Sequence, residues 1–212
     1  MANGYMGKLL NVDLTEGAIS VEKLSEELCA KFIGGYGLGA RLLYERIPAG
    51  ADPLGPENIL GILTGPLTGT PAVIGSRFVV VAKSPKTAGG WGDANCGGYF
   101  GPHLKFAGYD GILFNGIAPA LVYLFIDEGK AELLDAADLA GMGVSPLEDL
   151  LKERHGGRTR SEGLRRSSNS PPGSSETGPR RRGASAKVWR KCTPSTDSGF
   201  RASCGVACRA PT

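Results

Sequence analysis

The sequence predicts an α+β domain, rich in strands and with a few helices, followed by a disordered basic tail. Short segments of strand-forming residues outnumber helical ones and are joined by short turns, which favours an antiparallel or mixed sheet over a doubly wound fold. Large apolar residues become scarce after residue 156. A segment that buries little apolar surface does not offset the entropy lost on ordering. We therefore divide the chain into a folded domain, residues 1–156, and a low-complexity tail, residues 157–212.

The strands are predicted from runs of apolar and β-branched residues that are bounded by turn residues. The first two are joined by a turn at Thr15–Gly17 and form a hairpin. The third and fourth are almost continuously apolar, which is typical of buried strands. The complete set comprises residues 5–14, 18–24, 58–64, 77–83, 109–116, 121–127 and 130–135.

Two helices are predicted after the hairpin. Ser25 can cap a helix that runs to about Phe32, with acidic residues in its first turn, and the glycines at 34 and 35 stop it. The next helix is expected from about Leu38 to Arg46, because Pro48 prevents its continuation.

A third helix is predicted at the end of the folded domain. Ser145, Pro146 and Glu148 match a capping box, with Ser145 as the cap and proline at the first helical position. The helix is expected to continue through His155 and to stop at Gly156.

Charge and cysteine content indicate the compartment. Residues 157–212 carry twelve Lys or Arg and three Asp or Glu, a formal charge of +9, whereas the remaining residues carry twelve and eighteen, a charge of −6. No apolar run is long enough to span a membrane, and the first residues lack the apolar core of a signal peptide. Five cysteines without regular spacing predict no disulfide framework. We expect a cytoplasmic protein without a membrane partner.

Residues 64–109 are the most informative part of the sequence. Glycines, small polar residues, one arginine and one asparagine surround a single short strand there. Each glycine inside a regular element costs about 0.5–1 kcal/mol relative to alanine. So many glycines indicate a backbone that approaches something large and polar.

The polar positions of this segment allow two interpretations each. Arg77 follows Ser76 at the start of a strand, where arginine is commonly a solvated surface residue but where its planar fork also matches phosphate oxygens. Asn95 is followed by Gly97 and Gly98, and paired glycines let main-chain amides converge on an anion. A tight turn and a phosphate-binding loop explain this run of residues equally well.

Other motifs indicate less. Gly35–Ala40 matches a GxGxxA fingerprint, but a helical pattern precedes it, which favours a glycine joint between two helices over a dinucleotide site. A third option is that its backbone amides face a polar ligand. The only histidines, His103 and His155, belong to no group with zinc spacing, and no Ser/His/Asp set or paired carboxylates are evident. The sequence therefore assigns no catalytic residue.

Three motifs follow one another in the folded domain: DPLGPEN (52–58), TGPLTGTPAVIGSRFVVVAKSP (64–85) and ANCGGYFGPHLKFAGYDGILFNG (94–116). With the opening segment GKLLNVDLTEGAISVEKLSEELCAKFIGGYGLGARLLYE, they resemble the N-terminal domain of the tungsten-dependent aldehyde ferredoxin oxidoreductases. The resemblance covers residues 4 to about 156.

The resemblance implies a fold, an activity and cofactors. The domain would be a two-sheet base under a cofactor in which two pterins hold tungsten, or molybdenum, through dithiolenes, and magnesium bridges the pterin phosphates. The enzyme would oxidise an aldehyde to a carboxylic acid and pass electrons through one [4Fe–4S] cluster to ferredoxin. The cluster ligands are not expected in this chain, because Cys204 and Cys208 are too few thiolates. The chain alone would then be inactive.

Site residues follow from the resemblance position by position. Arg77 matches the arginine that contacts a pterin phosphate, Asn95 the asparagine associated with the magnesium, and Gly97 a glycine whose backbone touches the cofactor. Ser76 and Gly98 beside them complete the predicted cofactor-binding set. The chain departs from the family at Tyr36, where arginine is common, so a contact there is not carried over.

The tail has two open interpretations. A shifted reading frame in a GC-rich gene would explain why apolar residues are lost at one point without a linker. A natural basic tail would instead bind nucleic acid through phosphate contacts. We do not expect nucleic acid to be a partner; the resemblance implies an aldehyde and ferredoxin instead. The alternative function is a non-enzymatic protein that binds an anion or a pterin, or that binds nucleic acid through its basic tail.

Overall fold

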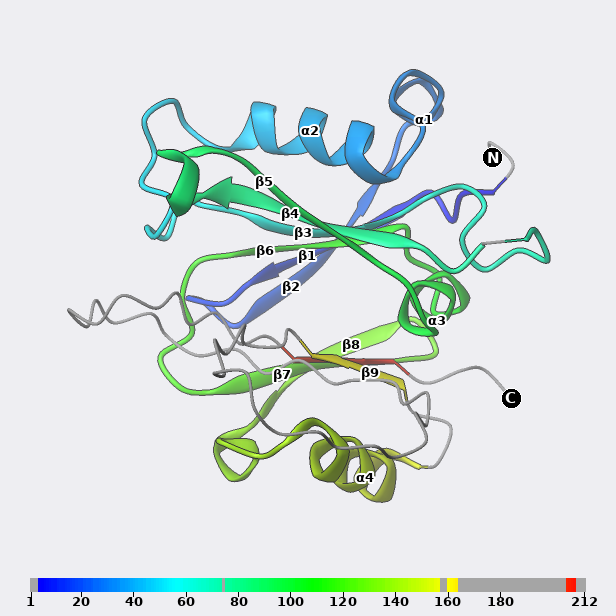
Figure 1. The fold of residues 1–212 in the computed structure, drawn as a ribbon, viewed down its shortest axis with the longest axis vertical. Coiled ribbons are helices and arrows are strands. Elements are labelled where there is room, and N and C mark those ends of the chain that lie inside the picture. Colours follow the sequence, from blue (N-terminus) through cyan, green and yellow to red (C-terminus); the bar gives the residue numbers. More distant parts are fainter. Residues whose placement is uncertain (1–3, 74, 157–159, 164–204, 209–212) are drawn as a thin grey trace, which may run out of the picture.

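The computed structural model describes residues 4–73, 75–156, 160–163 and 205–208, which form four layers (Figure 1). Two helices cover the outer face of a first sheet, a second sheet lies beneath the first, and one helix covers the far side of the second sheet. The predicted strand-rich α+β class with two sheets is thereby confirmed.

The first sheet has six strands and mixed pairing. Its strands β1 and β6 run parallel, and every other neighbouring pair is antiparallel. In spatial order they are β2 (Ala18–Lys23), β1 (Lys8–Asp13), β6 (Gly111–Asn115), β3 (Leu60–Thr64), β4 (Phe78–Ser84) and β5 (Gly90–Cys96). The hairpin of β1 and β2 was predicted, whereas β5 was not, because glycines and exposed polar residues hide its strand pattern.

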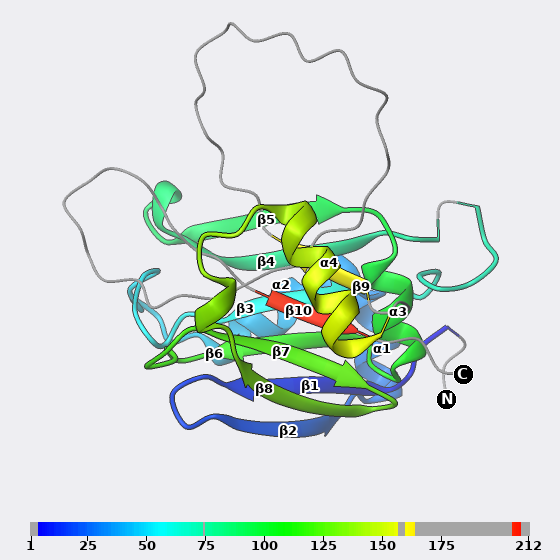
Figure 2. The ribbon, with the colours of Figure 1, turned by 90° about the horizontal axis from the view of Figure 1, so that it is seen from below.

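The second sheet has four strands. Their order is β8 (Lys130–Asp135), β7 (Val122–Asp127), β10 (Gly205–Cys208) and β9 (Arg160–Gly163). The backbone of β10 runs parallel to β7 and antiparallel to β9 (Figure 2). These two short strands lie within 157–212, where the sequence predicts a tail without secondary structure. Most of that segment lies outside the described residues, so the predicted domain boundary stays a prediction.

Alternation along the strands builds three layers of core. Leu10 of β1 and Leu124 of β7 belong to the cluster between the sheets. Leu9, the next residue along β1, faces the helices instead. Tyr123 and Phe125 of β7 face the helix beyond the second sheet. Period-two alternation therefore lets one strand contribute to two cores.

Helices α1 (Glu26–Phe32) and α2 (Gly35–Arg46) cover the first sheet. Ser25 caps α1 as predicted, because its side chain accepts the backbone N–H of Leu28 at 3.1 Å. Gly34 joins the helices at φ 65°, and a Cβ there would lie 2.8 Å from the carbonyl oxygen of Thr64. The joint itself is Ile33 and Gly34, and the GxGxxA match forms the start of α2, which begins at Gly35, three residues before the predicted Leu38.

Helix α4 (Val144–His155) ends before Gly156, as predicted, but the expected capping box is absent. The helix begins at Val144 with Gly143 as its cap, so Ser145 lies inside the first turn. Glu148 is buried and pairs with Lys152 at 2.6 Å instead of reaching back to a cap. The predicted cap was wrong by two residues, and that shift gives Glu148 a different partner.

Short elements complete the described chain. Helix α3 (Phe100–Phe106), which was not predicted, lies at one end of the two sheets, and η1 (Pro85–Thr87) and η2 (Ala137–Leu139) are single 3₁₀ turns. Among the described residues, no helix has the length and apolar character needed to cross a lipid bilayer.

Candidate functional site

Arg77 and Asn95 lie side by side at one end of the first sheet. Arg77 immediately precedes β4, Asn95 is near the end of β5, and β4 and β5 are neighbouring antiparallel strands. The Nε of Arg77 donates to Oδ1 of Asn95 at 2.6 Å. One of five guanidinium N–H groups is thus used by Asn95, which leaves those of the two Nη nitrogens for other acceptors.

The two glycines after Asn95 differ in what they require. A Cβ on Gly97 would lie 3.3 Å from Nη1 of Arg77, so a side chain there would crowd the guanidinium. Gly98 has φ 113°, a conformation that L residues rarely adopt, but a Cβ there would meet nothing within 4 Å. Gly97 therefore keeps space for Arg77, and Gly98 allows the chain to turn.

A hollow of about 170 Å³ lies beside Arg77 and Asn95. It is bounded by the start of α2, the end of β3 and the loop that leads to β4. The lining residues are Gly35, Tyr36, Leu63, Gly65, Thr68, Gly75, Arg77, Phe78, Val79 and Asn95. None of these described residues is a carboxylate, so the charged group at the wall of the hollow is a cation.

The remaining predicted site residues adjoin the hollow without lining it. Ser76 is half-buried between Gly75 and Arg77, and Gly97 and Gly98, which follow Asn95 in the chain, are exposed. A larger hollow of about 300 Å³, lined mostly by apolar atoms from β4, β5 and residues 53–60, lies elsewhere. The smaller hollow carries the guanidinium and the carboxamide, so we place the candidate site there.

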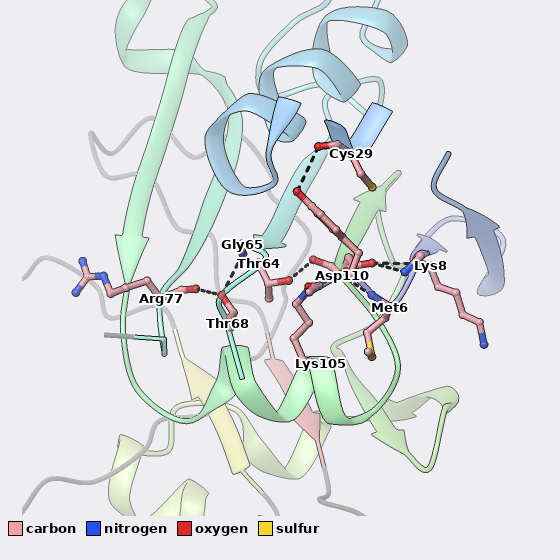
Figure 3. A network of polar contacts seen from close by, with 12 residues as sticks. Met6, Lys8, Cys29, Thr64, Gly65, Thr68, Arg77, Lys105 and Asp110 are labelled. Atoms are coloured by element: carbon pink, nitrogen blue, oxygen red, sulfur yellow. Dashed lines mark hydrogen bonds and ion pairs between the residues drawn. The ribbon is translucent and has the colours of Figure 1, made fainter. Parts of the chain in front are cut away.

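A buried polar network supports the site from behind (Figure 3). Thr68 Oγ1 donates to the carbonyl of Arg77 at 2.7 Å and accepts the N–H of Gly65 at 3.0 Å. Thr64 Oγ1, one residue before Gly65, donates to the carbonyl of Asp110 at 2.7 Å. The network therefore connects Arg77 to the start of β6 through the end of β3.

Asp110 is the centre of that network. Its carboxylate is 1% exposed and accepts the N–H of Met6 at 3.1 Å and of Gly7 at 2.6 Å. It also pairs with the buried Nζ of Lys105 at 2.5 Å, and the same Nζ donates to the carbonyl of Gly4 at 2.6 Å. A buried carboxylate is tolerated when it is paired and hydrogen-bonded in this way.

Sequence reasoning missed Thr64, Thr68, Lys105 and Asp110. The available signal was an aspartate directly before the apolar strand Gly111–Asn115, with a lysine five residues earlier. A charged residue next to a buried strand needs a partner, but the sequence does not identify that partner.

The histidines lie away from the hollow. Nδ1 of His103 is 2.8 Å from the carbonyl oxygen of Tyr99, and Nε2 of His155 is 2.7 Å from the hydroxyl of Tyr123. His155 also stacks on Phe125 with ring centroids 3.9 Å apart. Within the described part of the chain, no three His, Cys, Asp or Glu side chains are grouped so that they could hold a metal ion.

The residues of the hollow fit an anion. A guanidinium, a carboxamide and bare glycine backbone suit phosphate oxygens, and one carboxamide oxygen suits a magnesium ion that takes its other ligands from phosphates and water. Asn95 Oδ1 already accepts Arg77, but a carbonyl oxygen has a second lone pair. Among the lining residues there is no evident acid, base or nucleophile for a reacting substrate.

A match to a family model shows which protein family the chain belongs to. The model described as "Aldehyde ferredoxin oxidoreductase, N-terminal domain" matches residues 9–164. The chain belongs to the aldehyde ferredoxin oxidoreductase family. The resemblance predicted from the motifs is confirmed, and the match extends beyond residue 156 through β9.

Relatives in this family of oxidoreductases include two Pyrococcus proteins. The chain is 46% identical over 153 residues to a tungsten-containing aldehyde ferredoxin oxidoreductase of Pyrococcus abyssi, which covers 72% of this chain and 25% of the relative. It is 44% identical over 155 residues to the "WOR-like subunit" of an aliphatic sulfonate oxidoreductase of Pyrococcus furiosus, and this match covers 71% of this chain and 24% of the relative. The chain thus spans about a quarter of the length of these family members.

A solved structure shares the fold. The active-site complex BamBC of benzoyl coenzyme A reductase, solved with 1,5-dienoyl-CoA, matches with a TM-score of 0.72 and 37% identity. The match covers 76% of this chain and 24% of that one. The two-sheet domain therefore occurs in proteins named for different substrates.

Proposed function

We propose that this chain forms the base of the cofactor site in a tungsten-dependent aldehyde ferredoxin oxidoreductase. The observation that carries the proposal is the hydrogen bond between Arg77 and Asn95 beside a hollow whose described lining holds no carboxylate. Family membership and the tungsten in the names of curated relatives support it.

Each residue of the site has a separate task in this proposal. Arg77 would bind a phosphate of a pterin through its Nη groups, and Asn95 would hold the Arg77 side chain and offer its carbonyl oxygen to a bridging magnesium. Gly97 would let the cofactor approach the backbone, with Ser76 and Gly98 shaping the chain on either side.

The chain's own residues supply binding and orientation. Bound here, the tungsten or molybdenum bis-pterin would supply the two-electron oxidation of an aldehyde to a carboxylic acid. The [4Fe–4S] cluster and ferredoxin would take the electrons, with ligands that belong to the remainder of a full-length family member. We therefore expect no aldehyde-dependent dye reduction by this chain alone.

Arg77→Ala tests the proposal. Both proteins are produced with tungstate or molybdate in the medium. We expect the variant to contain about one tenth or less of the metal and pterin of the wild type, since a charge-assisted bond to phosphate contributes about 1.5–3 kcal/mol. The midpoint of thermal unfolding should change little, because the Arg77 side chain is exposed. Metal analysis and the fluorescence of oxidised pterin provide the two measurements.

Arg41→Ala is the matched control. Arg41 lies on α2 and pairs with Glu45 away from the hollow, so this variant removes the same charge without touching the site. Equal metal and pterin content in Arg77→Ala and Arg41→Ala would contradict the phosphate role of Arg77.

A further inference from the structure

Thr68 contacts both segments that carry the candidate site. It lies in the loop between β3 and β4 and is 5% exposed. Its hydroxyl donates to the carbonyl of Arg77 and accepts the N–H of Gly65 (Figure 3). The hydroxyl proton of Thr68 is therefore bonded to the main chain of Arg77, the residue that carries the guanidinium.

The methyl group of Thr68 faces the second segment. A Cβ added to Gly101 would lie 3.1 Å from Cγ2 of Thr68, so the methyl packs against the first turn of α3. That turn follows directly after the run from Asn95 to Tyr99. One side chain thus contacts the chain just before β4 with its hydroxyl and the chain just after β5 with its methyl.

We propose that Thr68 is a positioning residue for anion binding by Arg77, an inference that rests on the proposed function because it takes Arg77 as the phosphate ligand. Arg77 is then held at two points, its carbonyl by Thr68 and its Nε by Asn95. An arginine whose backbone and guanidinium are both restrained loses less conformational freedom when it binds phosphate. Loss of the Thr68 hydroxyl would therefore weaken anion binding by Arg77, although the hydroxyl donates its proton to the Arg77 carbonyl.

The loop offers a matched control in Thr70. Its hydroxyl also donates to a carbonyl, that of Leu67 at 2.8 Å, and accepts an N–H, that of Ala72 at 3.3 Å. Thr70 is exposed and makes neither bond to Arg77. Thr68→Val and Thr70→Val thus remove the same kind of hydroxyl from the same loop.

The test uses the 212-residue chain and inorganic phosphate. Titrations are followed by NMR, with the Nε–H signal of Arg77 as the probe and its exchange with water as a second readout. We expect Thr68→Val to raise the dissociation constant for phosphate about three- to tenfold, as for one lost hydrogen bond, and to speed the exchange of the Arg77 Nε–H. Thr68→Ser keeps the hydroxyl and should stay within about twofold of the wild type, as should Thr70→Val.

The outcomes separate the two claims. If Arg77→Ala binds phosphate as tightly as the wild type, or the wild type binds none, the proposed function fails, and the exchange readout still tests Thr68. If Arg77→Ala loses binding while Thr68→Val and Thr70→Val remain alike in both readouts, only the role of Thr68 is refuted. If Thr68→Val does not fold, Thr68→Ser decides: wild-type binding supports the proposal, and binding as weak as that of Arg77→Ala overturns it.

Discussion

At the scale of single residues, Arg77 gains its role from its neighbours. A solvated arginine samples many rotamers, but here Asn95 fixes Nε and leaves the Nη groups as the remaining donors. Gly97 keeps a side chain away from Nη1. The sequence indicated the chemistry of these residues, and the pairing of β4 with β5 brings them together.

Gly97→Ala and Gly98→Ala should distinguish the effect of steric crowding at Arg77 from the effect of backbone conformation. The Cβ introduced by Gly97→Ala would press on Nη1 of Arg77, so phosphate affinity should fall severalfold while the free energy of unfolding changes by less than about 0.5 kcal/mol. The Cβ introduced by Gly98→Ala would meet no atom within 4 Å, but the alanine would have to adopt φ 113°, at a cost of about 1–2 kcal/mol. Phosphate titration and chemical unfolding of both variants check this. Unchanged binding in Gly97→Ala together with reduced stability would contradict the assignment.

At the scale of elements, the sequence predicted those helix ends that depend on interactions between residues close together in the chain. Ser25 caps α1, and Gly156 ends α4, because these signals act within one helical turn. Strand β5 was missed because a glycine-rich edge strand lacks apolar alternation. Helix α3 was missed because it has only 7 residues, includes Gly101 and Pro102, and has no side-chain cap. The Asp110 network was missed because its partners are far apart in sequence: Met6 and Asp110 are 104 positions apart.

The packing of α4 on β7 should depend on pH through His155. Burial and the nearby charge of Arg154 lower the pKa of His155 below its ordinary value. Above a pH of about 6.5 the ring is neutral in both folded and unfolded chains; below it, the unfolded chain binds a proton first, so stability falls as the pH decreases. The loss should stay below about 1 kcal/mol, because the ring is partly exposed to solvent.

His155→Gln should reduce this pH dependence. Chemical unfolding at about pH 7.5 and about pH 5.5 measures it, because most carboxylates remain ionised over that range. The variant should be less stable at the higher pH, since it loses the stack on Phe125, but should lose less additional stability on acidification. An equal loss in both proteins would refute the contribution of His155.

At the scale of the whole molecule, the domain is a stack of layers with the candidate site at one end of the first sheet. Arg77 and Asn95 are exposed there, although the network that supports them is buried. The chain spans about a quarter of the length of its curated relatives, so the rest of such an enzyme has room to enclose a cofactor over this end. The two-sheet base followed from a resemblance, since composition alone indicated only a strand-rich α+β domain.

A crystal structure of the chain soaked with pyrophosphate tests the central claim most directly. We expect a phosphate group within hydrogen-bond distance of the Nη groups of Arg77, with the Arg77–Asn95 bond retained and the anion in the hollow that Gly35, Thr68 and Gly75 line. An anion bound elsewhere, with Arg77 turned away from Asn95 and an empty hollow, would contradict the account.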